Sequence, residues 1–403
     1  MILVFWLSAA VVAYVYVGYP CLLALWARFA PVRTTTPATS LEEDLETHRQ
    51  FPSVSIVIAA RNEAGRLAAR IDNLLALDYP AERRQIIVVS DGSTDDSLKL
   101  LARYRRVVKT VSVAAGGKAL ALNAGVARAR HAILVFADAR QVFAPDALKA
   151  LVAPFADRRI GGVSGELLLD AESALFSDRR AAADRRRGHV SQLRAVALER
   201  RGTPDRRRSI ASTIADGVGM YWRYEKALRR MESAVGSTLG ATGAIYAIRR
   251  SLWHDLPADT ILDDVLTPMR VVMAGFRVVF DERARAFDRA AVDADAEARR
   301  KIRTLAGNYQ LLTLEPRLLL PWRNPVWLQF VSHKLGRLAV PYVMLVAFAT
   351  SIMLATHPFY FVVLTAQVAF YLLAGYGAVL ELAARRSAEP SAPAAEITAS
   401  EVA

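Results

Sequence analysis

The sequence predicts an α/β protein in which a doubly wound, parallel sheet is joined to three transmembrane helices. Strand-like runs rich in β-branched residues lie at 52–60, 85–90, 107–113 and 132–137, and segments with helical apolar spacing lie between them at 61–77, 97–104 and 118–129. This alternation is typical of a parallel sheet covered by helices. The two ends of the 403-residue chain are much more apolar than its middle, which predicts the membrane segments.

The first apolar run covers residues 2–26 and contains no Lys, Arg, Asp or Glu. At about 1.5 Å per residue this length crosses the ~30 Å hydrocarbon layer. We therefore expect a transmembrane helix within residues 1–30. A cleaved signal peptide is the alternative, but the run begins without a basic flank and exceeds the length of a signal core.

Two further apolar runs, 338–356 and 359–380, predict a transmembrane hairpin within residues 338–384. Only His357 and Pro358 separate them. Basic residues flank the three spans on one side: Arg28, Arg33, Lys334, Arg337, Arg385 and Arg386. The positive-inside rule then places the middle domain, residues 50–310, in the cytoplasm.

The segment before the hairpin, residues 315–334, mixes Trp322, Trp327 and Phe330 with arginines. This composition predicts an amphipathic helix at the membrane interface, with an ordinary core helix as the alternative. Residues 387–403 are rich in Ala, Pro, Ser, Glu and Thr, which predicts a disordered tail.

Basic residues are concentrated in one segment of this basic chain, whose formal net charge is +13. Residues 178–208 contain eleven arginines and four acidic residues, a net charge of +7. With few bulky apolar residues, the segment is expected to be a disordered, solvated insertion, and binding to anionic lipid headgroups is the alternative. Nucleic-acid binding is disfavoured because the run lacks aromatic residues for stacking. The single cysteine, Cys21, excludes an intrachain disulfide and a cysteine zinc cluster.

Carboxylates follow two of the predicted strands. Asp91 ends the run at 85–90, and Asp138 follows the apolar run at 133–136. Ligands of such sheets bind at the carboxyl ends of the strands. Asp91 can accept hydrogen bonds from a base or a ribose, and Asp138 can ligate Mg²⁺ or Mn²⁺ beside a diphosphate. Helix capping by residues 93–95 and an ordinary strand-end aspartate are the alternatives.

Two more segments have chemically suggestive residues. A glycine-rich run, 116–125, begins a helix at Lys118, and a helix N-terminus beside a cation suits a diphosphate, although the P-loop spacing is absent. The pair Asp263 and Asp264 follows the small-residue segment 240–246. One of these carboxylates can deprotonate an attacking hydroxyl, while N-capping of a helix by Asp263 is the alternative explanation of the pair.

Six motifs occur in the order VSIVIAARNEA, VSDGSTDDS, GGKALALNAG, VFADAR, GATGAIYAIRR and LDDV. Together they resemble the family 2 glycosyltransferases of the A-type fold, over about residues 52–310, and in particular membrane-anchored bacterial polysaccharide and glycolipid synthases. The resemblance implies inverting transfer of a sugar from a nucleotide-sugar, commonly a UDP-sugar, to a glycan or lipid-linked acceptor. It further implies a divalent metal and a location in the bacterial inner membrane, among membrane lipids and without a nucleic-acid partner.

The resemblance also implies roles for individual residues. The nucleotide is expected to contact Ala59, Arg61, Glu63 and Asp91, and the diphosphate to lie near Lys118. Asp138 matches the first carboxylate of the family's Asp-x-Asp motif. Asp264, next to Asp263, matches the catalytic base. Glu63 can instead cap the following helix.

The chain departs from the family pattern at two places. Arg140 replaces the second carboxylate of Asp-x-Asp, so we expect weaker metal dependence, with the guanidinium binding phosphate in part. The Gln-x-x-Arg-Trp motif of processive synthases is reduced to residues 300–304, where Arg303 alone remains as a diphosphate contact. Transfer of one or a few sugars is therefore as strongly indicated as polymer synthesis.

An aromatic cluster has two interpretations. Tyr221, Trp222 and Tyr224 can form a platform for an acceptor sugar, but their spacing equally suits a helix packed on the core. The alternative function is a catalytically inactive membrane scaffold or synthase subunit. Arg140 favours this alternative, whereas Lys118, Asp138 and Asp264 argue against it.

Overall fold

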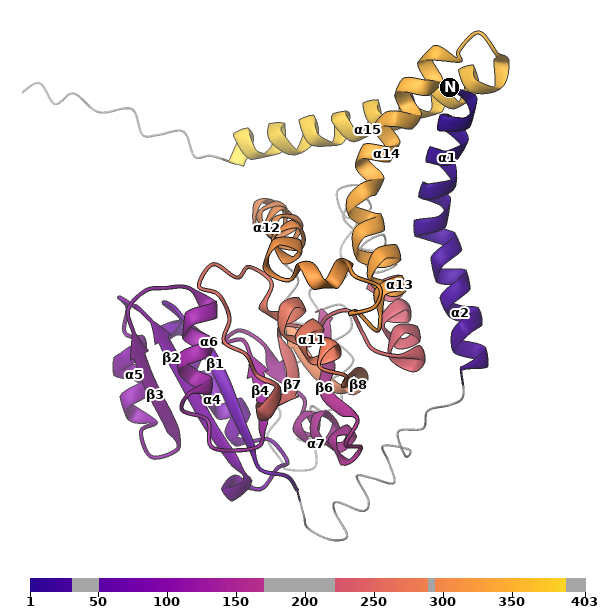
Figure 1. Ribbon diagram of the computed structural model, residues 1–403. Coiled ribbons are helices and arrows are strands. Elements are labelled where there is room, and N and C mark those ends of the chain that lie inside the picture. The colour runs from indigo at the N-terminus through magenta and orange to yellow at the C-terminus, as the bar shows by residue number, and fades with distance from the viewer. Residues whose placement is uncertain (31–50, 170–221, 289–293, 389–403) are drawn as a thin grey trace, which may run out of the picture. The chain divides into compact units, whose positions relative to one another are not determined.

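The computed structural model describes residues 1–30, 51–169, 222–288 and 294–388 (Figure 1). These form two compact units, one of Met1–Gly18 with Ala339–Ala403 and the other of Tyr19–Leu338. The Arg-rich segment 178–208, Tyr221 and the tail from residue 389 lie outside the described residues, so the predictions made for them stay predictions.

The larger unit is built on an eight-stranded sheet of order β3-β2-β1-β4-β7-β6-β8-β5. The first half is parallel, because β2 and β4 both pair in parallel with β1, and β3 pairs in parallel with β2. Its elements confirm the predicted alternation within a few residues: β1 Val54–Ala60, α4 Ala64–Leu75, β2 Arg84–Asp91, α5 Ser97–Arg103, β3 Val108–Val113, α6 Lys118–Val126 and β4 Ile133–Ala137.

The second half of the sheet differs from the predicted parallel arrangement. β7 (Ile245–Arg249) is antiparallel to both β4 and β6 (Ile160–Leu169), whereas β8 (Arg277–Asp288) is parallel to β6. The two-residue β5 (Val142–Phe143) closes the far edge against β8. The sheet is therefore mixed, because the segment before β7 returns to the edge at which β4 ends.

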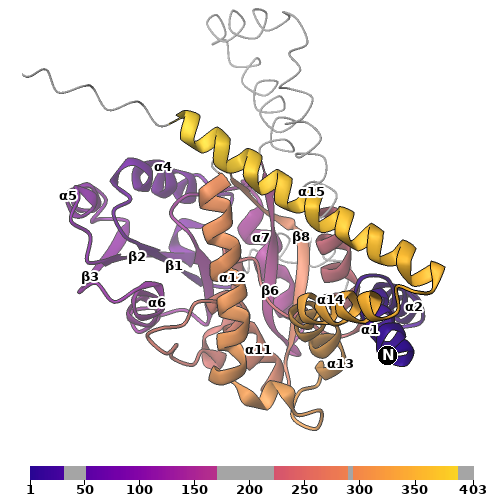
Figure 2. The same ribbon diagram turned by 90° about the horizontal axis from the view of Figure 1, so that it is seen from above.

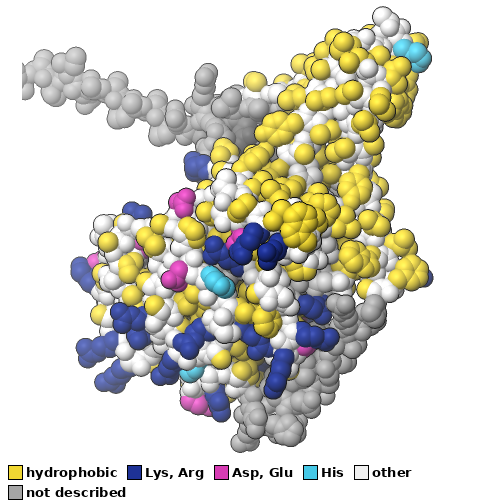
Figure 3. Space-filling model, viewed as in Figure 1, with side chains coloured by type: hydrophobic (Ala, Val, Ile, Leu, Met, Phe, Trp, Pro, Cys, Tyr) yellow, Lys and Arg dark blue, Asp and Glu magenta, His cyan; other side chains and the backbone are white. Residues whose placement is uncertain are grey.

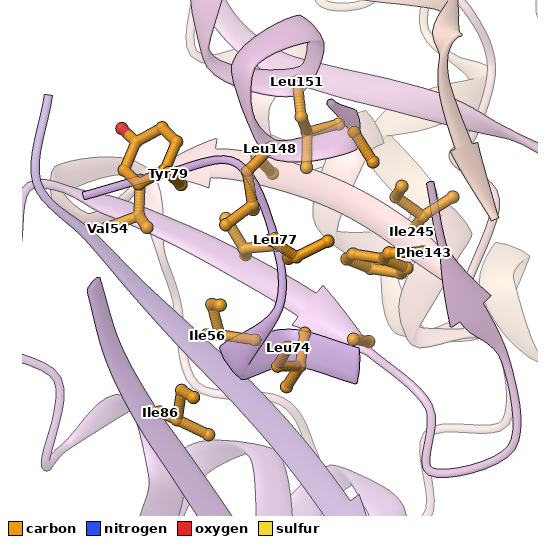
Figure 4. Packing of buried hydrophobic residues seen from close by; sticks show 14 of the residues in the cluster. Val54, Ile56, Leu74, Leu77, Tyr79, Ile86, Phe143, Leu148, Leu151 and Ile245 are labelled. Carbon is orange, nitrogen blue, oxygen red and sulfur yellow. The ribbon is translucent and has the colours of Figure 1, made fainter. Parts of the chain in front are cut away.

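Helices cover both faces of the sheet (Figure 2). One face packs on α4 and α7 (Ala147–Val152), where apolar residues on one side of α4 meet buried strand residues such as Ile56 (Figure 4). The other face packs on α6 and α11 (Asp263–Met273). Short 3-10 turns complete this part at Ala81–Arg83, Ala153–Ala156 and Arg250–Leu252. The β-branched composition of the strands is explained by this two-sided burial.

Three apolar helices have the length and composition to cross a membrane: Ile2–Phe29, Trp327–Met353 and Pro358–Gly377. They contain α1 Ile2–Ala13, a π-helix Tyr14–Gly18, α2 Tyr19–Phe29, α14 Gly336–Met353 and part of α15 Pro358–Ala388. In the smaller unit Phe5 packs against Tyr360, with ring centroids 5.0 Å apart. The visible surface of α14 is mostly hydrophobic in Figure 3, as expected of a helix in lipid.

The segment 315–334 is not the single amphipathic helix that was predicted. A 3-10 turn, Pro316–Leu319, is followed by a non-helical stretch, and α13 Trp327–Gln329 then runs through the π-helix η7 Phe330–Leu335 into α14. Pro321 and Pro325 explain the break, since proline lacks the N–H that a helix interior needs. The residues from 327 onward therefore begin the second hydrophobic helix.

The larger unit contains two further long helices. α12 spans Ala294–Leu314, and an unlabelled helix spans residues 222–235. Tyr19 and Leu23 of α2 pack with Leu228 and Val235 of that unlabelled helix in a small separate core.

Candidate active site

The candidate site lies where the parallel strands end. Because β1, β2 and β4 run in the same direction, their carboxyl ends lie side by side along one end of the sheet. β7 runs in the opposite direction, and Ile245 at its start pairs with Ala137 at the end of β4. The small-residue segment 240–244 and the N-terminus of α11 are thereby brought beside Asp138.

Lys118 connects two of the predicted site carboxylates. Its Nζ lies 3.3 Å from Oδ1 of Asp138 and 3.3 Å from Oδ1 of Asp263. Burial lowers the pKa of Lys118, but the charges of Asp263, Asp138 and Asp264 together raise it by a larger amount, so the net shift is upward. The ammonium group therefore carries its charge at any physiological pH.

Leu262 occupies the N-cap position of α11, and Asp263 is the first helical residue. The capping explanation of the Asp263–Asp264 pair is therefore wrong. The Asp263 side chain is only 5% exposed, and its Oδ2, like the hydroxyl of Tyr246, is buried without a hydrogen-bond partner among the described residues. Burial and then Asp263 raise the pKa of Tyr246, so this hydroxyl keeps its proton.

Asp264 lies next to the backbone of the small-residue segment. Its carbonyl accepts the Ala241 N–H at 2.7 Å, and a Cβ at Gly243 would lie 2.8 Å from its Oδ2, so glycine makes room for the carboxylate. Burial raises the pKa of Asp264 to about 6, and Asp263 adds to this, while the charge of Lys118 opposes it. A half-buried carboxylate with a pKa near 6 is suited to act as a general base near neutral pH.

Asp91 is buried and holds the glycine-rich turn. Its Oδ1 accepts the Gly116 N–H at 2.7 Å, and its Oδ2 accepts the Gly117 N–H at 3.0 Å. Gly117 has a φ of 90°, a conformation that favours glycine. These two N–H groups are therefore occupied by Asp91, and the structure does not present them to a diphosphate as the sequence had suggested.

The loops after β1 and β2 are joined by side-chain hydrogen bonds. Asn62, with a φ of 55°, accepts the Thr94 N–H at 2.8 Å. The carboxylate of Asp95 accepts the first N–H of α4 and that of α5, from Ala64 and Ser97, both at 3.0 Å. Capping by the 93–95 segment is thus confirmed, and it serves two helices. The sequence analysis missed Asn62, although asparagine is one of the few residues that readily adopt a positive φ.

The other residues expected at the nucleotide lie around these loops. Ala59 is half-buried in β1, and Arg61 is exposed just beyond the strand. Glu63 occupies the N-cap position of α4 without a capping hydrogen bond and instead lies 3.2 Å from Nη1 of Arg66. Its capping role is therefore not supported.

Arg140 is held by an acidic residue that the sequence analysis missed. Its Nη2 donates to Oδ2 of Asp288 at 2.6 Å, and Nε2 of Gln141 donates to the same oxygen at 2.9 Å. Asp288 is the last residue of β8 and is buried. No local sequence signal marks it, because its partner is 148 residues away.

Helix α4 contributes a buried arginine, Arg70, that interacts electrostatically with Asp138. Arg70 is 2% exposed and stacks on Phe143, with its Cζ 4.1 Å from the ring centroid. Its Nη1 donates to Asn73, whereas Nε and Nη2 have no partner among the described residues. Burial lowers the pKa of Arg70 to about 9 while Asp138 opposes this, so the guanidinium remains charged at neutral pH.

Two of the remaining predicted residues make other contacts. Arg303, on the exposed side of α12, donates to the carbonyl of Ile261 at 3.3 Å and so lies near the Asp263 loop. Tyr224 packs on the core that contains Tyr19, and the Cζ of Arg337 lies 5.6 Å from its ring centroid. This favours the packing interpretation for Tyr224. Trp222, which begins the same helix, is half-buried.

The charges around Asp138 do not fit a divalent cation. Among the described residues no group of three or more acidic, histidine or cysteine side chains is arranged to hold a metal. Asp138 faces the ammonium of Lys118, and the residue two positions later is the cationic Arg140. Two fixed positive charges therefore stand where a metal would need negative ligands.

A comparison with protein families matches residues 55–229 to glycosyl transferase family 2. Residues 55–229 form a family 2 glycosyltransferase domain. Over 140 residues this domain is 30% identical to a beta-monoglucosyldiacylglycerol synthase of Synechocystis sp., and over 133 residues it is 27% identical to a poly-beta-1,6-N-acetyl-D-glucosamine synthase of Staphylococcus epidermidis. The matches cover 33% and 32% of this chain, but only 29% and 32% of those relatives.

The glycosyltransferase domain and its flanking helices also resemble a solved structure. A mannosyltransferase from Pyrobaculum calidifontis, in complex with GDP-Man and Mn²⁺, matches with a TM-score of 0.60 and 20% identity, over 91% of this chain and 96% of that one. This likeness confirms the A-type glycosyltransferase fold that the sequence predicted.

Proposed function

We propose that this protein transfers a sugar from a nucleoside-diphosphate sugar to a hydroxyl of a membrane-associated acceptor, with inversion at the anomeric carbon. The observation that carries the proposal is the arrangement at the carboxyl ends of the parallel strands, where Asp264, with a pKa of about 6, lies beside the ion pair between Asp263 and Lys118. Lys118 belongs to the family 2 glycosyltransferase domain. Inversion follows from a single displacement, in which the acceptor oxygen attacks the face opposite the leaving diphosphate.

Asp264 is the proposed base. The acceptor oxygen forms a bond to the anomeric carbon, the bond from that carbon to the diphosphate oxygen breaks, and the acceptor proton goes to the Asp264 carboxylate. Asp263 and Lys118 form an ion pair at 3.3 Å, and the pKa of the neighbouring Asp264 is raised by burial and then by the charge of Asp263. A pKa near the working pH is what efficient proton transfer requires.

The departing diphosphate needs positive charge, and we propose that Lys118 and Arg140 supply it. Lys118 keeps a raised pKa and Arg140 is half exposed at the same strand end, anchored by Asp288. A guanidinium held by one carboxylate still has N–H groups for phosphate oxygens. The solved relative contains Mn²⁺, but the residues around Asp138 in this chain argue for protein cations instead.

The nucleoside is proposed to lie over the loops that follow β1 and β2. Ala59, Arg61, Glu63 and Asp91 line this end of the sheet. Asp91 is proposed to act in two ways, since it fixes the Gly116–Gly117 turn and keeps a lone pair for a base or ribose. Arg303, beside the Asp263 loop, is proposed to approach the diphosphate from α12.

The membrane location is proposed from the three apolar helices and from the glycolipid synthase relative. The positive flanks of the spans support the proposal that the glycosyltransferase domain lies on the cytoplasmic face of a bacterial inner membrane. The solved mannosyltransferase is in complex with GDP-Man, so UDP- and GDP-sugars are both candidate donors.

The test is a donor screen with purified protein in lipid nanodiscs. Release of nucleoside diphosphate and incorporation of labelled sugar into the lipid fraction are measured for UDP- and GDP-sugars, and Asp264→Asn is assayed alongside. We expect release with one class of donor and a loss of at least a hundredfold in the variant. Equal release from both proteins would remove Asp264 as the base, and no release from any donor would favour an inactive membrane scaffold.

A further inference from the structure

One basic side chain close to the proposed base has no acidic partner among the residues that the structure describes. Arg229, on the helix of residues 222–235, donates from Nη1 to Oγ1 of Thr242 at 2.9 Å. Thr242 is followed in the chain by Gly243, at which a Cβ would be 2.8 Å from Oδ2 of Asp264. Arg229 is thus hydrogen-bonded to Thr242, the residue next to the glycine that faces the Asp264 carboxylate.

A second such side chain approaches Asp264 from the hydrophobic helix. Lys334 is half-buried in η7, next to His333, whose Nδ1 lies 2.7 Å from Oε1 of Glu232. Burial and Asp263 raise the pKa of Asp264, and the charge of Lys334 is, with that of Lys118, one of the two that lower it. Lys334 is therefore an electrostatic neighbour of the base, on an element separate from the strand ends.

Three other basic residues in this part of the structure are paired with carboxylates. The pairs are Lys226 with Glu166, Arg230 with Glu282, and Arg337 with Glu225. Arg229 and Lys334, in contrast, form no ion pair among the described residues. The half-buried Lys334 is repelled by the charge of Arg229 and attracted by those of Asp264, Glu225 and Glu232. An anion bound between Arg229 and Lys334 would remove the repulsion between the two cations.

The position of Lys334 indicates where such an anion comes from. Lys334 is close to the start of the membrane-crossing helix Trp327–Met353, about 10 Å along it at 1.5 Å per residue. That distance corresponds to the headgroup region rather than the centre of a bilayer. A lipid phosphate lies at this depth and approaches from the membrane side, whereas the donor binds at the strand ends.

We propose that Arg229 and Lys334 bind the phosphate of the acceptor, and that the acceptor is a membrane lipid whose headgroup carries both a phosphate diester and a free hydroxyl. This inference rests on the proposed glycosyl transfer. The two cations bind the phosphate oxygens and position the headgroup hydroxyl at Asp264. That hydroxyl oxygen bonds to the anomeric carbon, its proton passes to Asp264, and the nucleoside diphosphate leaves.

Three short-chain lipids in mixed micelles separate the chemical requirements. Phosphatidylglycerol has the phosphate and the hydroxyl, diacylglycerol has only the hydroxyl, and phosphatidate has only the phosphate. We expect sugar transfer to phosphatidylglycerol, competitive inhibition by phosphatidate, and poor transfer to diacylglycerol. Inorganic phosphate is included to separate a lipid phosphate from a free one, and we expect it to inhibit at least tenfold more weakly than phosphatidate.

Two variants test the assignment of the site. Arg229→Gln and Lys334→Gln are expected to raise the KM for phosphatidylglycerol at least tenfold and to weaken phosphatidate inhibition equally, while the donor KM stays within twofold. Arg230→Gln, on the same helix but paired with Glu282, is the matched control and should behave as the wild type.

Several outcomes would overturn the proposal. Diacylglycerol serving as well as phosphatidylglycerol would indicate a neutral acceptor, and a raised donor KM in both variants would move the two cations to the donor side. Equal inhibition by inorganic phosphate and phosphatidate would remove the lipid.

A binding measurement separates this proposal from the proposed function. If the wild type hydrolyses no donor, the glycosyltransferase assignment fails, yet phosphatidate should still raise its unfolding temperature more than that of Arg229→Gln. An equal rise in the two proteins would overturn the phosphate site independently of catalysis.

Discussion

Replacing Asp264 by asparagine should abolish most of the activity and yet stabilise the fold at neutral pH. Asparagine has nearly the same shape as aspartate, so the space left by Gly243 should accommodate it. The charge is what changes. In the folded protein the Asp264 carboxylate is half-buried and close to the carboxylate of Asp263, and these effects exceed the opposing attraction of Lys118 and Lys334.

The size of the effect follows from the pKa of Asp264. The pKa rises from an ordinary 3.8 to about 6 in the folded state, and this shift corresponds to about 3 kcal/mol of destabilisation when the group is ionised. Solvent reaching the half-buried carboxylate reduces this to about 1–3 kcal/mol. Because the folded-state pKa is raised, the cost is fully present above pH ~6 and disappears as the pH falls towards the unfolded value.

Thermal unfolding of the two proteins in detergent, between pH 5 and pH 8, measures this cost. At pH 8 we expect Asp264→Asn to unfold about 2–10 °C above the wild type, since 1 kcal/mol corresponds to about 2–4 °C in a domain of this size. At pH 5 the difference should be at most about half as large. In the same preparations kcat of the wild type should fall below pH ~6, and the variant should lose about 10²–10⁴-fold in kcat.

Asp96→Asn is the matched control, because the Asp96 side chain is exposed and forms a surface ion pair with Lys99. It should leave both activity and the pH dependence of unfolding unchanged. An Asp264→Asn difference in unfolding temperature that is the same at pH 5 and pH 8 would refute the raised pKa. Retained activity in the variant would refute its role as the base.

Three further substitutions probe the rest of the site. Gly243→Ala places a Cβ 2.8 Å from Oδ2 of Asp264, so kcat should fall at least tenfold with an unchanged donor KM in steady-state assays. Lys118→Met leaves the 5%-exposed Asp263 without its cation, and chemical denaturation should show a loss of about 1–3 kcal/mol together with a raised donor KM. Arg140→Asp restores the Asp-x-Asp spacing, and we expect activity in EDTA to fall at least tenfold and added Mn²⁺ to recover part of it.

Each of these substitutions has a control. Gly65→Ala adds a methyl group in open space on α4 and should leave kcat unchanged. The double variant Lys118→Met/Asp263→Asn should regain stability but not activity, which separates the loss of the ion pair from the loss of the cation. Arg159→Asp, at an exposed position, should create no response to Mn²⁺. Wild-type activity abolished completely by EDTA would contradict the assignment of Lys118 and Arg140 to the diphosphate.

The parallel half of the sheet could be predicted closely, and the reason is local. Strands such as β1 are buried on both faces, so their sequences are continuous apolar runs, while α4 shows one apolar side. The mixed half was not predicted, because nothing within the sequence of β7 specifies that it runs antiparallel to β4. The direction of a strand depends on the end of the sheet to which the preceding segment brings the chain.

The candidate site shows the same division. Asp138 and Asp264 could be assigned to it because a strand end and a helix start are visible in the sequence. The partners of the charged groups could not, since Arg140 meets Asp288 across 148 residues and Lys118 joins two segments far apart in the chain. The prediction of a single interfacial helix over residues 315–334 was wrong, because Pro321 and Pro325 interrupt the helix despite the amphipathic pattern.

The sequence by itself thus determined the three long apolar helices, the order of the first strands and helices, and the identity of the carboxylates at the strand ends and at the start of α11. Only the tertiary structure decided which of those carboxylates pairs with Lys118 and which has a raised pKa. The physical reason is that an apolar pattern is a property of neighbouring residues, whereas the pKa of Asp264 depends on burial and on the charges of Asp263, Lys118 and Lys334, which folding brings together from three elements.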